Sequence, residues 1–259
     1  MWTDTHLHLD ANEYAPDREL VTARARDRDV TRFVVPAVCR ANFDTVQQLA
    51  HQTPGVFYCL GIHPMYVHNA QVEDLDALRS KVQECLNDPL FAGIGEIGLD
   101  GFEPNPDWTR QTLFFYAQLR LAREFDLPVV MHVRRSQDLI LKGLRQFKPK
   151  SGIAHAFNGS FQQAEEFLKL NMCLGFGGAC TFTRALQIRR LATELPLEAL
   201  VLETDGPDIA PSWIAKERNA PEHLPRIAQV VAGLRGINLP ALSTATQANA
   251  IRVLPKLQP

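Results

Sequence analysis

Residues 91–133 read FAGIGEIGLDGFEPNPDWTRQTLFFYAQLRLAREFDLPVVMHV, and their pattern recurs along the chain. They begin with a short apolar run over 91–97, continue with apolar residues at helical spacing over 106–125, and end with a second apolar run over 128–133. Asp126-Leu127-Pro128 ends the helix and starts the next strand, because proline is tolerated as the first residue of a strand. The stretch therefore predicts a strand, a helix and a second strand, as in an α/β fold.

The same alternation of short apolar runs and longer amphipathic segments continues along most of the 259 residues. Eight runs are strand candidates: 2–8, 32–38, 56–62, 91–97, 128–133, 152–157, 171–177 and 199–204. Eight strands alternating with helices, without a low-complexity linker, predict a TIM-type (β/α)8 barrel forming one domain over residues 1–259. The competing open doubly wound sheet would need a G-x-G-x-x-G sequence after its first strand, and none follows. Helical patterns over 221–235 and 240–253 come last, and we expect both to pack on the outside.

Composition and charge disfavour several classes of protein. Hydrophobic residues make up 46% of the chain, charged residues 22%, and the formal net charge is -2, which disfavours a DNA-coating protein but allows a local basic rim. The five cysteines are odd in number and form no C-x-x-C, as is typical of a reducing compartment. Neither a signal peptide nor a bilayer-spanning apolar stretch is visible, so we expect a cytoplasmic protein and not a membrane protein. We also expect a monomer or weak oligomer.

Five of the eight histidines lie at the ends of predicted strands or just beyond them. They are His6, His8, His63, His132 and His155. The carboxyl ends of the strands share one face of a barrel, and barrel enzymes carry their active sites on that face. These histidines, although distant in sequence, are therefore predicted to converge in space.

His6-Leu7-His8 is the first candidate metal-binding sequence. An H-x-H is often incidental, but residues i and i+2 of a strand face the same side, so Asp4, His6 and His8 would share one face. Glu96 lies in an apolar strand, where an ionised carboxylate is costly unless it is paired or coordinates a cation. A salt bridge to an arginine is the alternative for Glu96.

Further candidates end three later strands. His132 and His155 end successive strands, which favours a shared ligand role over two separate structural histidines. Asp205 and Glu203 share a face by strand alternation, with Asp205 nearer the barrel mouth as the metal or catalytic carboxylate. Glu203 and, by its position, Asp4 are expected to contact the metal ligands without binding the metal. Glu203 would fix the tautomer of a histidine. His63 is expected near the substrate outside the metal shell, a structural histidine being the alternative.

The predicted ligands comprise four imidazoles and two carboxylates: His6, His8, Glu96, His132, His155 and Asp205. This set is too large for one tetrahedral zinc and suits two divalent metal ions that share a bridging group. Zn, Mn, Ni, Co and Mg are the candidates, and nitrogen donors favour the transition metals over Mg. Such a pair lowers the pKa of a bridging water and stabilises an oxyanion, so hydrolysis is the reaction it serves most directly.

Seven short motifs follow one another along the chain: D-T-H-x-H at 4–8, G-I-H-P at 61–64, G-E-I-G-L-D at 95–100, H-x-R at 132–134, H-x-F-x-G at 155–159, E-T-D at 203–205 and R-N-x-P at 218–221. In this order they resemble the TatD family of metal-dependent deoxyribonucleases, within the amidohydrolase-type barrels. The resemblance implies phosphodiester hydrolysis of DNA, with Asp205 orienting or deprotonating the attacking water. It further implies a first metal ion on His6, His8 and Asp205, a second on His132 and His155, and Glu96 as the bridge.

The chain departs from the family's usual residues around the substrate. Ala156 and Asn158 stand where the family often has a cysteine and a serine, and Gly101-Phe102 stands where a tyrosine commonly follows G-E-I-G-L-D. Gly206 replaces a frequent alanine. None of these changes removes a predicted ligand, so they concern the choice of substrate.

The leading hypothesis is a deoxyribonuclease that trims single-stranded DNA ends like a 3'–5' exonuclease, with Asp205, Glu96 and His63 as catalytic residues. Arginines near the barrel mouth could meet phosphates, unless they are only solvated surface charges: Arg134, Arg135, Arg184 and Arg218. The alternative is amidohydrolase-type hydrolysis of an ester or amide bond, including an aminoacyl ester on nucleic acid. Glu96 stands where many amidohydrolase relatives have a carboxylated lysine, which by resemblance favours the nuclease. The complete ligand set disfavours a third hypothesis, a non-catalytic binding protein.

Overall fold

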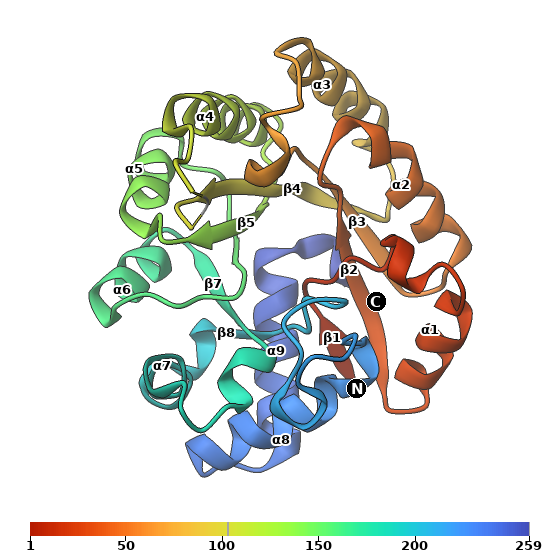
Figure 1. Cartoon of the computed structure of the whole chain (residues 1–259), viewed down its shortest axis with the longest axis vertical. Coiled ribbons are helices and arrows are strands. Elements are labelled where there is room, and N and C mark those ends of the chain that lie inside the picture. Colours follow the sequence, from red (N-terminus) through yellow and green to blue (C-terminus); the bar gives the residue numbers. More distant parts are fainter. Residues whose placement is uncertain (103, 259) are drawn as a thin grey trace.

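The computed structural model describes residues 1–102 and 104–258. Its centre is an eight-stranded parallel sheet in which each strand pairs with the next along the chain. Figure 1 shows the sheet curling into a ring, so the predicted TIM-type barrel is confirmed. The strands are β1 (Trp2–Asp4), β2 (Val30–Pro36), β3 (Val56–Leu60), β4 (Phe91–Asp100), β5 (Val129–Arg134), β6 (Gly152–Ala154), β7 (Met172–Phe176) and β8 (Leu200–Leu202).

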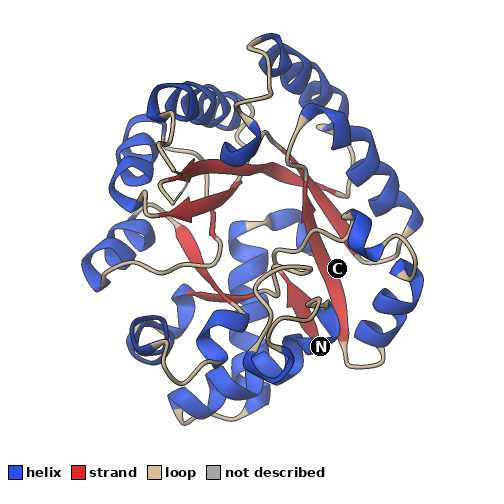
Figure 2. Ribbon diagram, in the orientation of Figure 1, coloured by secondary structure: helices blue, strands red, loops and turns tan. Residues whose placement is uncertain are grey.

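Helices surround this ring, except that the last of them crosses behind it (Figure 2). They are α1 (Arg18–Arg26), α2 (Phe43–Gln52), α3 (Glu73–Cys85), α4 (Trp108–Glu124), α5 (Gln137–Phe147), α6 (Phe161–Lys169), α7 (Leu186–Glu194), α8 (Leu224–Arg235) and α9 (Leu239–Val253). The helix predicted over 106–125 is α4, and Asp107 sets its start by accepting a hydrogen bond from Arg110 N at 2.9 Å. Among the described helices, none combines the length and apolar character that a membrane span requires.

Apolar side chains pack in two layers, one between the strands and the outer helices and one inside the ring. The inner layer takes one residue from each of β2 to β8: Val34, Cys59, Ala92, Val130, Ile153, Cys173 and Val201. Ala250, Val253, Leu254 and Leu257, in and after α9, complete this layer. In Figure 1, α9 is seen through the ring. The expectation that 240–253 packs on the outside is therefore wrong, whereas α8 does lie on the outside beside α7.

Residues just beyond the strand ends close the ring between β8 and β1. Thr5 N donates a hydrogen bond to Leu202 O at 3.0 Å, and Asp205 N donates one to His6 O at 2.9 Å. We call this contact the seam. It joins the first and last strands at their carboxyl ends, where the predicted ligands lie.

Candidate metal centre

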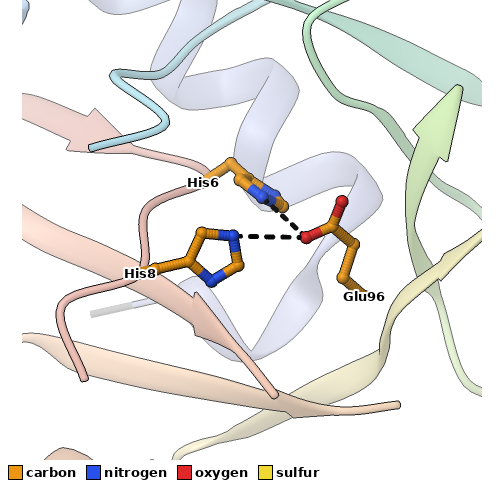
Figure 3. A group of neighbouring side chains, drawn as sticks. All are labelled: His6, His8 and Glu96. Carbon is orange, nitrogen blue, oxygen red and sulfur yellow. Dashed lines mark ion pairs between the residues drawn. The ribbon is translucent and has the colours of Figure 1, made fainter. Parts of the chain in front are cut away.

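Glu96, from β4, lies at the centre of a cluster of imidazoles, and Figure 3 draws it with two of them, those of His6 and His8. Its side chain is almost fully buried. Its Oε2 lies 3.1 Å from His6 Nε2 and 3.4 Å from His8 Nε2. Both histidines follow β1, and their rings meet nearly at a right angle, at 87°, with centroids 5.2 Å apart. Two histidines therefore direct the same ring nitrogen at one carboxylate oxygen.

The other oxygen of Glu96, Oε1, contacts three further histidines. It lies 3.1 Å from His63 Nε2, 3.1 Å from His132 Nδ1 and 2.9 Å from His155 Nε2. His63 follows β3, His132 belongs to β5, and His155 follows β6. The structure thus brings together all five histidines that the sequence places at strand ends.

Asp205 joins the cluster from the β8 side. Its Oδ1 lies 3.5 Å from His6 Nε2 and 4.0 Å from His8 Nε2. The ring of His6 stacks on that of His155, with centroids 3.9 Å apart and planes only 6° from parallel. All six predicted ligands therefore lie in one cluster at the carboxyl end of the barrel.

The backbone that carries His6, His8 and Asp205 differs from the prediction. The strand β1 ends at Asp4 and β8 ends at Leu202, so strand alternation does not extend to these three residues. Asp205 has a left-handed backbone with φ 57°. The seam, which ties Asp205 N to His6 O, holds their loops together instead.

Burial and close contacts set the charges in the cluster. Burial lowers the pKa of His6 to about 3, so its ring is neutral at pH 7 and keeps a free lone pair. Burial opposes ionisation of Glu96, but the surrounding imidazoles outweigh it and hold its pKa well below the usual value. Burial also disfavours a charged His155, yet Glu96 beside it raises its pKa to about 10. A cation bound beside Glu96 would replace the proton on His155.

The donor atoms of the cluster fit divalent cations. His6 Nε2 and Glu96 Oε2 are buried, 3.1 Å apart, and without a hydrogen-bond partner among the described residues. Buried polar atoms rarely lack a hydrogen-bond partner in the protein unless they contact a bound ligand. Three groups place one donor atom per residue within 4.8 Å of one another: His6, His8 and Glu96; His6, His155 and Asp205; and His63, Glu96 and His132.

His63 is close to Glu96 but is a poor metal ligand. Its Nδ1 accepts a hydrogen bond from Met65 N at 3.1 Å, which places the proton of the neutral ring on Nε2. Burial lowers the pKa of His63 to about 4, so the ring is neutral at pH 7. Its Nε2 therefore donates toward Glu96 Oε1 and has no lone pair for a cation. The geometry agrees with a place outside the metal shell, and its catalytic role stays a prediction.

Asp100 is a site residue that the sequence reasoning did not assign. It is buried at the end of β4, and its Oδ2 lies 2.8 Å from His132 Nε2. With Nε2 held in this way, His132 presents Nδ1 to Glu96. The signal was available in the sequence, because Asp100 follows Glu96 by four residues in one strand and so lies on the same face.

We expect Asp100→Asn to weaken metal binding by about 10–100-fold, because the ring of His132 loses the charged group that orients it. Isothermal titration of the metal-free protein with Mn²⁺ or Zn²⁺ measures this change. Asp76→Asn, at an exposed position on α3, is the matched control and should bind metal as the wild type does. Equal affinities for Asp100→Asn and the wild type would remove Asp100 from the site.

Glu203 and Asp4 support the cluster through different contacts. Glu203 Oε1 accepts a hydrogen bond from Ala156 N at 2.5 Å and lies 3.8 Å from His155 Nδ1, beyond hydrogen-bond distance. Burial raises the pKa of Glu203 to about 8. Asp4 accepts hydrogen bonds from Thr204 N at 2.9 Å and from its hydroxyl at 2.5 Å. Asp4 thus holds the loop after β8 in place.

Glu203→Gln should weaken metal affinity by about 10–100-fold, with a milder loss of rate than a change at Asp205. The substitution removes a carboxyl group that can ionise beside His155 but keeps an oxygen that can accept the hydrogen bond from Ala156 N. Metal titration is again the measurement. Glu198→Gln, an exposed glutamate shortly before β8, is the control. An affinity unchanged in Glu203→Gln would contradict a supporting role.

A cavity of about 1230 Å³ opens onto the cluster. It is lined by five of the six predicted ligands, His6 being fully buried beneath them. Arg134 and Arg135 also line it, and both are exposed. Arg184 instead lines a separate small pocket with Phe182. Two of the four candidate arginines therefore reach the cavity.

Arg218 is not among the described residues that line the cavity. Its guanidinium forms two bonds to the Asp17 carboxylate, at 2.8 and 2.7 Å, and donates to Glu13 O at 2.5 Å. It also lies over the ring of Tyr14, 4.9 Å from the centroid. Three of its five N–H donors are engaged in this way, and Arg218 fastens the loop after β1. Its predicted role in substrate binding stays a prediction.

Gly206, where similar sequences often have alanine, has a physical reason to lack a side chain. A Cβ at this position would lie 2.4 Å from the hydroxyl of Tyr14. That hydroxyl is buried and donates to Asn219 O at 2.6 Å, so it cannot move away without losing its partner. The position of the Tyr14 hydroxyl therefore requires glycine at position 206.

Comparisons with known proteins agree with this geometry. A sequence model of the family described as "TatD related DNase" matches residues 3–255. The chain is 36% identical over 233 residues to an uncharacterized metal-dependent hydrolase, YjjV, of Escherichia coli (strain K12), with 90% of this chain and 89% of that protein aligned. It is 32% identical over 257 residues to the 3'-5' ssDNA/RNA exonuclease TatD of Erwinia billingiae, covering 95% and 96% of the two chains. The crystal structure of the Escherichia coli TatD homologue YjjV superposes with a TM-score of 0.92, at 33% identity over 98% of each chain.

Proposed function

The chain belongs to the TatD-related DNase family of metal-dependent hydrolases, and from this premise we propose that it hydrolyses phosphodiester bonds at the ends of single-stranded DNA. One observation carries the proposal: Glu96 lies among five histidines beside Asp205, beneath a cavity that Arg134 and Arg135 line. The 3'–5' direction is proposed from the similarity to the exonuclease of Erwinia billingiae. We also propose that the barrel works as one domain in the cytoplasm.

Two divalent ions are proposed to bind in the cluster. Glu96 supports this number, because its two oxygens face different sets of imidazoles and could serve one ion each. The proposed ligands are His6, His8 and Asp205 for the first ion, His132 and His155 for the second, and Glu96 for both. When bound, such ions supply a water of lowered pKa and stabilise the developing negative charge.

The protein's own groups would orient the reactants around this centre. Burial raises the pKa of Asp205, which suits a carboxylate that accepts a proton from the attacking water. The ring of His63 lines the cavity, where it could contact the substrate, and its Nε2–H donates toward Glu96 Oε1 and so helps to orient that carboxylate. Asp100 keeps the ring of His132 in place, and Arg134 and Arg135 are placed to contact phosphates.

The alternative is hydrolysis of an ester or amide. The arginines favour a nucleic acid, because a small neutral ester or amide offers no charge for Arg134 and Arg135 to bind. An aminoacyl ester on nucleic acid would keep these phosphate contacts while changing the bond that is broken. It is therefore the alternative that the activity test must separate.

The decisive experiment compares substrates side by side on the metal-loaded protein. These are single-stranded DNA, duplex DNA, single-stranded RNA, a small phosphodiester, an aminoacylated oligonucleotide, a carboxylic ester and an amide. We expect the highest kcat/KM on single-stranded DNA, with mononucleotides released from one end. Asp205→Asn, purified in the same way, controls for contaminating nucleases. A higher kcat/KM on the ester, amide or aminoacyl ester than on DNA would overturn the proposal.

A further inference from the structure

Phe102 is an exposed aromatic residue at the edge of the cavity. It follows β4 and is 51% exposed, and it lines the same cavity as Glu96 and Asp205. The ring is not among the described residues that form or pack against the hydrophobic core. It offers an apolar face to whatever enters the cavity.

The position of Phe102 is tied to the candidate metal centre by one residue. Phe102 N donates to Asp100 Oδ1 at 2.7 Å, and the other oxygen of Asp100 lies 2.8 Å from His132 Nε2. The neighbouring Gly101 N donates to Arg134 O at 2.7 Å. The backbone under the ring is therefore fixed relative to the ligands, as a binding site requires.

Two guanidinium groups accompany the ring. Arg134 Cζ lies 3.7 Å and Arg135 Cζ 4.7 Å from the centroid of Phe102. Four of the other arginine–phenylalanine pairs involve rings packed against the core, such as Phe125 beside Arg79, and the remaining one, Arg184 with Phe182, lies outside the cavity. Such pairs are common surface contacts. The pair of arginines at Phe102 differs, because its ring is exposed in the cavity.

The charges of the cavity are divided between its two sides. Arg134 is the last residue of β5 and Arg135 follows it, whereas Asp10, Glu13 and Asp208 line the cavity from the loops after β1 and β8. Figure 1 shows β4 and β5 across the ring from β1 and β8. A negatively charged chain is attracted to the β4–β5 side and repelled by the opposite side. The aromatic ring lies on the attractive side.

We propose that Phe102, Arg134 and Arg135 form a nucleotide subsite, in which one base of single-stranded nucleic acid stacks on the phenyl ring and neighbouring phosphates contact the guanidinium groups. Aromatic rings beside cations are the usual means of binding single strands without sequence preference. The inference rests on the proposed function, because the bound strand must lead to the cluster. It adds the direction of approach, from the β4–β5 side.

The test measures binding by the metal-loaded Asp205→Asn protein, which removes cutting from the measurement. The probes are a fluorescent single-stranded dT oligomer and an abasic oligomer with the same number of phosphates. We expect the dT oligomer to bind more tightly. Phe102→Leu should weaken its binding by about 5- to 150-fold and remove most of the difference between the oligomers, whereas Phe102→Tyr should retain it. Phe125→Leu, at the other end of the barrel, is the control.

The arginines are tested by the dependence of binding on salt. Each phosphate neutralised on a single strand contributes about −0.7 to the slope of log affinity against log salt. Arg135→Gln should reduce the slope by about this amount for both oligomers, because the abasic oligomer keeps its phosphates. A slope unchanged by Arg134→Gln and by Arg135→Gln would overturn the phosphate contacts.

The outcomes separate this inference from the proposed function. Equal binding of the two oligomers would overturn the subsite even if the wild type cuts DNA. Base-dependent binding that Phe102→Leu abolishes, in a protein that cuts no nucleic acid, would overturn the proposed nuclease activity and leave the subsite standing. Failure to bind either oligomer would overturn both.

Discussion

Asp205→Asn should lower kcat by about 10²–10⁴ under saturating metal while the fold stays intact. Asparagine keeps the shape of the side chain and can still coordinate through its oxygen, but it cannot accept a proton from water. The side chain is buried between His6 and the cavity, so the change acts where the water would be activated. The rate on a small phosphodiester, compared with that on DNA, measures the effect on the chemical step.

Two controls accompany this variant. Asp44→Asn, at an exposed position on α2, should keep the wild-type rate. The thermal midpoint of Asp205→Asn should match that of the wild type within a few degrees, which shows that lost activity is not lost structure. A kcat close to the wild-type value would give Asp205 a structural role only.

Glu96→Gln should have the larger effect, because this one carboxylate contacts all five histidines of the cluster. We expect fewer than two metal ions per chain and a fall in turnover of more than about 10³-fold, since a shared ligand and its charge are lost together. Atomic absorption of the dialysed protein gives the metal content, and the phosphodiester assay gives the rate.

Comparison with Glu203→Gln separates the two glutamates. Both are buried, but Glu203 contacts only His155 of the histidines, at 3.8 Å. Glu203→Gln should recover its activity at high metal concentration, and Glu96→Gln should not. Two ions bound to Glu96→Gln with wild-type affinity would show that Glu96 is not the bridging ligand.

The barrel could be predicted from sequence because each strand is a short apolar run and each helix an amphipathic one. The residues at which the strands end could not be predicted in this way. A strand ends where its neighbour stops pairing, and β1, β6 and β8 stop before the predicted residues, at Asp4, Ala154 and Leu202. The position of α9 was also hidden, because its apolar face looks the same whether it covers the barrel interior or the outside of the strands.

The candidate site could be predicted more fully than its surroundings. Ligand residue types at strand ends identify a cluster, since a barrel brings those ends together. The partners of charged side chains depend on contacts between distant residues. Arg218 is paired with Asp17, 201 positions earlier, and no local pattern indicates such a pair. Asp100 is different, because its spacing from Glu96 within one strand was a local signal.

The seam has a consequence for the order of events during synthesis. Asp205, the backbone partner of His6 in the seam, is synthesised about two hundred residues after it, some tens of seconds later at slow elongation rates. Until β8 arrives, the loops of His6 and His8 have nothing to close against, and the cluster lacks its last carboxylate. A nascent chain without β8 therefore lacks Asp205, one of the six proposed metal ligands.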